Sequence, residues 1–200
     1  PKLTKKLTAL YHVADRHPWG DKLLAESAVK FYAVFDWQPM LSEMRLIKSP
    51  NEIRLMQQAG QITAFGHIKA MQVTRPNRFE YEIESEILHE FNRHGARFPS
   101  YNSIIAGGDN ACILHYTEND QPLKDGDLVL IDAGCEFAMY AGDITRTFPV
   151  NGKFTQPQRE IYELVLKAQK RAIELLVPGN SIKLANDEVI RIKTQGLVDL

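Results

Sequence analysis

Apolar residues recur at helical spacing in two stretches before the middle of the chain, and each stretch carries the end signals of a helix. Ser49 and Glu52 form a capping box, and Pro50 suits a first turn, which predicts a helix from there to about Gln72. The apolar stripe of this helix is predicted to contain Ile53, Met56, Gly60, Ala64 and Ile68. A second helix is predicted over 80–94, with Gly95 as its C-cap and the apolar stripe Ile83, Ile87, Leu88 and Phe91.

From Pro99 onward the spacing becomes that of strands. Strands are predicted over 101–106, 111–115, 128–137 and 139–150, separated by turn residues such as Gly107, Gly108 and Pro122. Two further helices follow, one from the capping box at Thr155 to about Leu176 and one from Ser181 to about Thr194. The first of these is predicted to turn inward Ile161, Leu164, Val165, Ala168, Ala172 and Leu175. Helices, then strands, then helices indicate an α+β fold rather than alternating βαβ units.

Residues 1–47 follow a different pattern and are predicted to be the tail of a preceding N-terminal domain and its linker. They contain a loop over 15–20, a helix over 22–30 and an apolar run over 29–37. Nothing in this segment closes a core of its own. The main domain is therefore predicted to cover 48–200.

Two aspartates, Asp132 and Asp143, lie inside the apolar runs that predict the last two strands. If these strands form a hairpin that turns near Phe137 and Ala138, residues whose numbers sum to 275 face each other, and the aspartates become cross-strand partners. Two carboxylates in that position repel each other, and their burial is costly. A pair of metal ions would offset both penalties. An aspartate at the end of an apolar strand is, alternatively, an ordinary turn or capping residue.

Three further residues could take part in chemistry near these aspartates. His115 follows an apolar run, and a histidine there could donate to a carbonyl oxygen or carry a proton, or simply be a hydrogen-bonded residue at a strand end. Thr145 shares a face with Asp143 by strand alternation and could orient that carboxylate, although threonine is also a common strand residue. Tyr101 is a weaker candidate of the same kind. Gly107 and Gly108 lack the spacing of a phosphate loop and indicate a tight turn.

Composition narrows the class of protein. The 200 residues include 24 lysines and arginines against 25 aspartates and glutamates, a net charge of −1 without a basic cluster, which argues against nucleic acid or an anionic membrane as a partner. No apolar stretch approaches the roughly 20 residues of a membrane span. The two cysteines, Cys112 and Cys135, are predicted to be buried free thiols, as in a cytoplasmic protein.

Four segments together closely resemble the Xaa-Pro aminopeptidases, or aminopeptidase P enzymes, of the pita-bread metallopeptidase family, which also contains prolidase, methionine aminopeptidase and creatinase. The segments are His94 to Asn102, Ile113 to Tyr116, Leu128 to Gly134 and Tyr140 to Phe154. The resemblance covers about residues 45–200 and implies the N-terminal half of a pita-bread catalytic domain. It further implies two divalent metal ions, usually manganese in this family, and a bridging hydroxide that attacks the scissile carbonyl and so releases an N-terminal residue that precedes proline.

The resemblance assigns Asp132 and Asp143 as metal ligands and His115 as the histidine on the substrate side. The family completes its site with one histidine and two glutamates from a later part of the fold. The histidines of this chain are at 12, 17, 67, 89, 94 and 115, none of them after Asp143, so two of five ligands are present. The chain therefore looks truncated, and we expect it to be inactive by itself. The full-length protein is expected to be a homo-oligomer that acts on peptides with proline in second position.

Two other functions compete with this one. Prolidase, which cleaves Xaa-Pro dipeptides, is the nearest alternative among enzymes. A pita-bread domain can also be a non-catalytic module that binds peptides, but such a domain would be expected to have replaced the two aspartates, and this chain keeps both.

Overall fold

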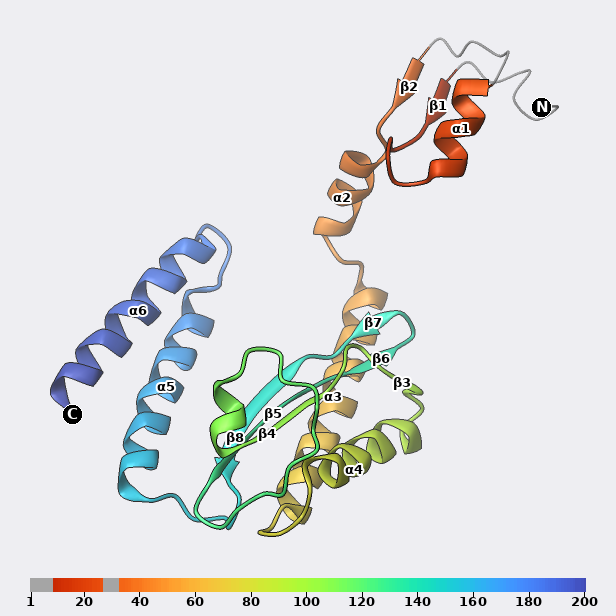
Figure 1. Ribbon diagram of the computed structural model, residues 1–200. Coiled ribbons are helices and arrows are strands. Elements are labelled where there is room, and N and C mark those ends of the chain that lie inside the picture. The colour runs from red at the N-terminus through yellow and green to blue at the C-terminus, as the bar shows by residue number, and fades with distance from the viewer. Residues whose placement is uncertain (1–8, 27–32) are drawn as a thin grey trace. The chain divides into compact units, whose positions relative to one another are not determined.

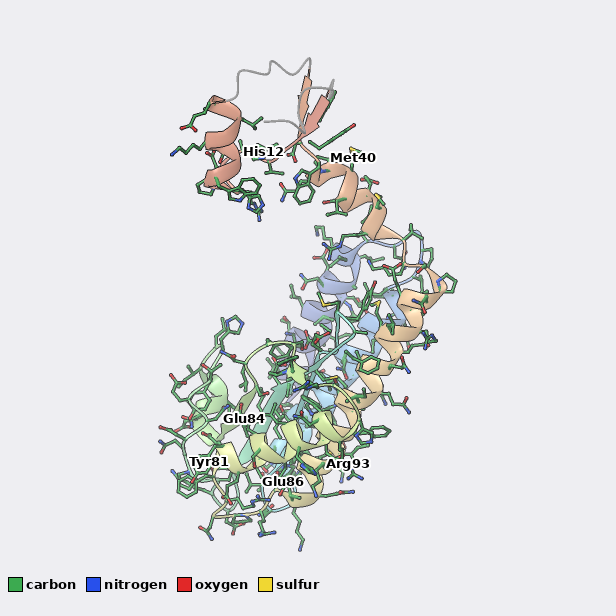
Figure 2. The ribbon with its side chains drawn as sticks, turned by 90° about the vertical axis from the view of Figure 1, so that its right-hand side faces the viewer. His12, Met40, Tyr81, Glu84, Glu86 and Arg93 are labelled. Carbon is green, nitrogen blue, oxygen red and sulfur yellow. The ribbon has the colours of Figure 1, made fainter. Side chains whose placement is uncertain are left out.

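A computed structural model describes residues 9–26 and 33–200, and the chain divides into two compact units, residues 1–54 and residues 55–200. In the first unit, strand β1 (Ala9–Tyr11) pairs in parallel with β2 (Ala33–Phe35), and helices α1 (Pro18–Glu26) and α2 (Gln38–Leu46) follow these strands in turn. His12, labelled in Figure 2, lies 2.6 Å from a carboxylate oxygen of Asp21 through its Nε2 atom. The helix predicted over 22–30 begins earlier, at Pro18, and its predicted residues from 27 lie outside the described part.

The second unit contains most of the remaining elements, and Figure 1 shows their arrangement. Two helices come first, α3 (Pro50–Val73), which begins before the boundary of the unit, and α4 (Glu80–Arg93). One small antiparallel sheet has the order β3-β6-β7, and a second has the order β4-β5-β8. Their strands are β3 (Phe98–Pro99), β4 (Ile104–Gly107), β5 (Leu128–Ala133), β6 (Cys135–Phe137), β7 (Tyr140–Ala141) and β8 (Ile144–Pro149). Helices α5 (Gln156–Leu175) and α6 (Ile182–Asp199) complete the predicted α+β order.

The helix ends follow the predicted capping chemistry. The Ser49 backbone N–H donates to Glu52, and the Glu52 backbone N–H donates to the Ser49 hydroxyl, as a capping box requires. Thr155 and Gln158 form the same reciprocal pair at the start of α5. Ser181 accepts from the Leu184 backbone N–H at the start of α6, which ends at Asp199 rather than at Thr194.

Three strand predictions need correction. Residues 111–115 form no strand, because a 3-10 helix η2 (Gly108–Cys112) and a turn occupy this stretch. The strand predicted over 101–106 begins only at Ile104. The two long strands predicted over 128–137 and 139–150 are each interrupted, the first at Gly134 and the second at Gly142 and Asp143.

The predicted apolar stripe of α3 was wrong, because its longer members face outward. Ile53, Met56 and Ile68 are exposed, whereas the buried residues are Ala59, Ile62, Thr63, Gly66, His67 and Ala70. Small side chains let this helix approach its neighbours closely: a Cβ added at Gly66 would lie 2.7 Å from Cε1 of Phe91 in α4. The face of α3 that packs on the core therefore consists mainly of small or polar side chains, with Ile62 as its one large apolar residue. The stripe predicted for α4 is confirmed, since Ile83, Ile87 and Phe91 are fully buried.

The two faces of the β4-β5-β8 sheet have different surroundings. Val129, Ile131 and Ala133 of β5 belong to the main core together with residues of α3 and α4. Residues on the opposite face, among them Ile104, Ala106 and Leu130, pack around Tyr116 in a second, smaller cluster. Asp132 shares this second face by strand alternation, and η2 contacts both β4 and β5.

Helices α5 and α6 lie side by side (Figure 1), and Gly196 of α6 lies against Leu164 of α5. Ala168 is buried as predicted, but Ile161 and Val165, which were predicted to face inward, are exposed. This helical pair leaves further apolar side chains exposed, including Ile173, Leu176, Ile182, Ile190 and Leu197. Within the described part of the chain, no helix is both long and apolar enough to cross a membrane.

Candidate metal and peptide site

The register of the aspartate hairpin differs from the predicted one by two residues. Asp132 of β5 pairs with Thr145 of β8, not with Asp143. The chain turns at Ala138 and Met139, both of which have positive φ angles, whereas the predicted turn was one residue earlier. Two residues with positive φ are typical of the tightest hairpin turn, which usually contains Asn or Gly. Here the Glu136 side chain accepts from the Met139 backbone N–H, which supports a turn without glycine.

The two carboxylates nevertheless converge. Asp143 directly precedes β8, and its position two residues before Thr145 keeps it on the same face as Asp132. The Tyr101 hydroxyl lies 2.6 Å from a carboxylate oxygen of Asp132 and 3.0 Å from one of Asp143. Both aspartates therefore direct an oxygen toward one point in space. Burial, together with the hydrogen bonds to Asp132 and then Asp143, holds the pKa of Tyr101 well above its usual range.

An open pocket of about 390 Å³ brings four of the five predicted site residues together. It is lined by Tyr101, Asn102, Ile104, His115, Thr117, Asp132 and Asp143. His115 is exposed, with a φ of 56°, in a turn rather than at the end of a strand as predicted. Because His115 lines the same pocket as the two aspartates, a ligand bound beside them would lie on the same side of the molecule as its imidazole.

Thr145, the fifth predicted residue, is the direct cross-strand neighbour of Asp132 and is exposed. It does not line the pocket. Its predicted role of orienting a carboxylate stays a prediction.

Two glycines allow close approaches beside the aspartates: Gly134 lets the two aspartate strands come together, and Gly142 lets the second strand lie against α3. A Cβ at Gly134 would lie 1.8 Å from the carbonyl oxygen of Gly142, and a Cβ at Gly142 would lie 2.1 Å from the Thr63 hydroxyl. The Gly142 N–H donates to the Cys135 carbonyl at 2.8 Å, and Ser100 Oγ donates to the Gly142 carbonyl at 2.8 Å. These contacts fix the backbone directly before Asp143.

His67 contacts the backbone next to Asp132 from the buried face of α3, and the sequence did not single it out. It is 3% exposed on α3, and its Nε2 atom lies 3.1 Å from the carbonyl oxygen of Ala133, next to Asp132. Burial holds the pKa of His67 below its usual value, although the contact with Ala133 opposes this shift. The available signal was its helical spacing from Ala59 and Thr63, which places it on the buried face of α3.

The donor set fits part of a metal site. Carboxylate oxygens are preferred ligands of hard divalent cations such as Mn²⁺, and the two aspartates converge without any lysine or arginine in ion-pair contact with them among the described residues. The same part of the chain contains no group of three or more His, Cys, Asp or Glu residues that could hold a metal ion. Two carboxylates could supply only part of the coordination sphere of a divalent ion. Both cysteines are free; Cys135 is buried as predicted, whereas Cys112 is exposed.

Comparisons with known proteins agree with this geometry. Residues 54–198 match the model of metallopeptidase family M24. The chain is 87% identical over 200 residues to an Xaa-Pro aminopeptidase of Haemophilus influenzae, covering all of this chain and 46% of that protein. Among solved structures, it matches proline aminopeptidase P II from Yersinia pestis with a TM-score of 0.95 and 50% identity. It also matches Zn-substituted aminopeptidase P of Escherichia coli, in complex with product, with a TM-score of 0.94 and 51% identity.

Each structural match covers the whole of this chain and 48% of the solved chain. The chain thus spans about half the length of the curated relatives it matches. These likenesses confirm the predicted pita-bread fold and its N-terminal portion.

Proposed function

Because the chain belongs to metallopeptidase family M24, we propose that it forms part of a metal-dependent aminopeptidase that removes an N-terminal residue preceding proline. The observation that carries this proposal is the convergence of Asp132 and Asp143 on the Tyr101 hydroxyl, in a pocket that His115 also lines. The names of the relatives, Xaa-Pro aminopeptidase and aminopeptidase P, supply the substrate class.

In this proposal Asp132 and Asp143 hold divalent metal ions. When bound, such ions make water a nucleophile at neutral pH and polarise a peptide carbonyl. The Tyr101 hydroxyl donates to the carboxylates and orients their oxygens, and Thr145 supports Asp132 from the neighbouring strand. Two carboxylates carry a charge of −2 against +4 for two divalent ions, so the remaining ligands, one histidine and two glutamates by resemblance, are needed for tight binding.

His115 is the group that meets the substrate. Its exposed imidazole lies in the same pocket as the aspartates, and by resemblance it is on the substrate side of the site rather than among the metal ligands. An imidazole can donate a hydrogen bond to the scissile carbonyl oxygen or transfer a proton near neutral pH. We therefore assign it to the binding and polarisation of the peptide.

Several properties of the whole protein extend this proposal. Manganese is the proposed metal, because the donors present are oxygens. Residues 1–47 are proposed to belong to a domain separate from the catalytic one, since they fall in the first compact unit and the family match begins at residue 54. Free rather than disulfide-bonded cysteines support a cytoplasmic location, and a homo-oligomer is proposed for the full-length protein.

The test uses the full-length protein that contains this chain, stripped of metal with a chelator and then reloaded with Mn²⁺. We expect it to release the first residue from a tripeptide with proline in second position and to leave the matched alanine tripeptide intact. Asp143→Asn should abolish this activity, whereas the control Asp125→Asn, which changes an exposed turn residue, should preserve it. The proposal fails if the reloaded protein hydrolyses no peptide of this kind.

Two further measurements separate the proposal from its alternatives. A clear preference for the Xaa-Pro dipeptide over the tripeptide would indicate a prolidase. The isolated 200-residue chain should bind Mn²⁺ weakly and show no peptidase activity, because only two ligands of the site are present. Two tight metal sites with activity in the isolated chain would contradict this expectation.

A further inference from the structure

His115 lies in a segment with little regular structure of its own. Residues 108–121 connect β4 with the turn before β5, and η2 is their only helical part. His115 adopts a φ of 56°, and the two residues before it, Ile113 and Leu114, are exposed. A left-handed conformation is uncommon for a residue other than glycine and persists only where its surroundings hold it. The contacts that fix this segment therefore decide where the imidazole points.

One side chain outside the segment makes most of these contacts. Glu80, the first residue of α4, is fully buried. Its Oε1 atom accepts from the Gly107 N–H at 2.9 Å and from Asn110 Nδ2 at 3.0 Å. Its Oε2 atom accepts from the Tyr116 hydroxyl at 2.7 Å and from the Gln121 N–H at 3.0 Å. The carboxylate thus joins both ends of the segment and the residue directly after His115.

The chemistry of the four partners matches a carboxylate and no other side chain of that size. An ionised carboxylate only accepts hydrogen bonds and has about four acceptor sites, and all four partners are donors. A buried carboxylate without such partners would be strongly destabilising. Among the described residues no lysine, arginine or histidine forms an ion pair with Glu80, so these donors and the N-terminal end of α4 stabilise it.

A second contact from the same helix fixes the far end of the segment. Asn119 is buried, and its side-chain oxygen accepts from the Ile105 N–H of β4. Its amide group donates to Glu84, which is labelled on α4 in Figure 2. The segment is thus held to α4 before and after His115, while the imidazole itself stays exposed in the pocket.

We propose that Glu80 is a positioning residue for the reaction: it fixes the 108–121 segment so that His115 projects into the pocket beside Asp132 and Asp143. The catalytic part of this inference rests on the proposed function of His115. The geometric part, that Glu80 holds the segment and directs the ring, does not.

Glu80→Gln provides the test because it preserves the size of the side chain while replacing one acceptor oxygen with an amide donor. Whichever oxygen is replaced, a backbone N–H, that of Gly107 or of Gln121, then faces a donor. Glu90→Gln is the matched control, since Glu90 is also buried on α4 but contacts Arg93 and His94 instead of the segment. Both variants are made in the full-length protein that contains this chain.

Three properties are measured for each variant: hydrogen exchange of the 108–121 amides, the NMR signal of the His115 ring identified with a His115→Asn variant, and kcat and KM for a tripeptide with proline in second position. We expect Glu80→Gln to raise exchange in the segment by about tenfold, the factor that corresponds to about 1.4 kcal/mol, and to shift the ring signal. It should lower kcat/KM by at least the same factor per folded, metal-loaded molecule, and Glu90→Gln should change none of the three.

Each result decides the proposal. Unchanged exchange and an unchanged ring signal in Glu80→Gln overturn it, and so does a kcat/KM that falls only in proportion to the folded fraction. If the wild-type protein cleaves no such peptide, the proposed function fails, but the exchange and ring measurements still establish or refute the hold of Glu80 on His115. A shift of the ring in both variants would show a general effect of buried charge on α4 and would also overturn the proposal.

Discussion

Replacing Gly134 with alanine tests whether the close approach of the two aspartate strands limits stability. The added methyl group would lie 1.8 Å from the Gly142 carbonyl oxygen and 2.9 Å from Ser100 Oγ. Cβ atoms essentially never come within 3.0 Å of another heavy atom, so the Gly142 backbone would have to move by about 1.2 Å, the difference between these distances. Backbone on both sides is already fixed by hydrogen bonds, which leaves it little room to move.

The cost follows from what this movement disrupts. Overpacking of a close-packed region costs typically about 1–3 kcal/mol. Three hydrogen bonds meet at this point: Ser100 N–H to Gly134, Ser100 Oγ to Gly142, and Gly142 N–H to Cys135. Each contributes about 1 kcal/mol when intact. We therefore expect Gly134→Ala to lower the free energy of unfolding by about 3 kcal/mol or more.

Urea unfolding of the full-length protein followed by circular dichroism measures this change, and Gly60→Ala is the matched control. Gly60 lies within α3, and a Cβ added there meets nothing within 4 Å. Because alanine is favoured over glycine in a helix by about 0.8–1.0 kcal/mol, this control should be neutral or stabilising. If Gly134→Ala destabilises the protein by less than about 1 kcal/mol, the strands can separate without cost and the packing argument is wrong.

Three other predictions concern the site and its surroundings. Asp132→Asn should lower the Mn²⁺ content of the purified full-length protein, measured by atomic spectroscopy, because a neutral amide replaces a charged ligand; an unchanged metal content would remove Asp132 from the site. His115→Asn should leave the metal content unchanged and lower kcat for a proline tripeptide by about 10²–10⁴-fold, whereas a loss of metal would show that the histidine is a ligand. Burial, and then the hydrogen bond to Glu80, raises the pKa of Tyr116 to about 12. The stability that this shift contributes should be complete below about pH 10 and lost as the pH rises through about 12, and a Tyr116→Phe variant followed over the same range should lack this loss.

The register of the hairpin shows which conclusions a strand pattern can support. The pattern located the turn one residue too early, because Ala138 and Met139 carry none of the glycine or asparagine signals of a tight turn. The partner of Asp132 consequently became Thr145 in place of Asp143. Since side chains alternate with a period of two, a two-residue change of partner leaves the face unchanged. Both aspartates therefore share a face, as predicted, although the predicted pairing was incorrect. A change of partner by one residue would have placed them on opposite faces.

The residues that hold the site in place could not be predicted from a local sequence pattern. Glu80 and Tyr116 are 36 residues apart, and His67 and Ala133 are 66 apart. No local spacing signals such contacts, because only the packing of α3 and α4 against the sheet brings them together. The α3 stripe failed for a related reason: the core selects small residues such as Gly66 where the helix lies against Phe91, and hydrophobicity alone favours the larger residues on the opposite side. The helix starts at Ser49 and Thr155 were predicted well because a capping box is complete within four residues, whereas the start of α1, which lacks this signal, was not.

Each aspartate motif contains a glycine close to the aspartate, and the two residues have connected roles in the backbone geometry. Asp132 lies two residues before Gly134, and Asp143 lies directly after Gly142. A Cβ at Gly134 would meet the backbone of Gly142 on the other strand, whereas a Cβ at Gly142 would meet Thr63 and Ala59 of α3, and both strands are interrupted at these glycines. The absence of a side chain at Gly134 lets the two strands come together, and its absence at Gly142 lets the second strand lie against α3; in this arrangement both carboxylates reach the Tyr101 hydroxyl. Glycine and aspartate therefore act as one unit in each motif: a side chain at Gly134 should push the two strands apart, one at Gly142 should push the second strand away from α3, and either should displace a carboxylate as well as destabilise the fold.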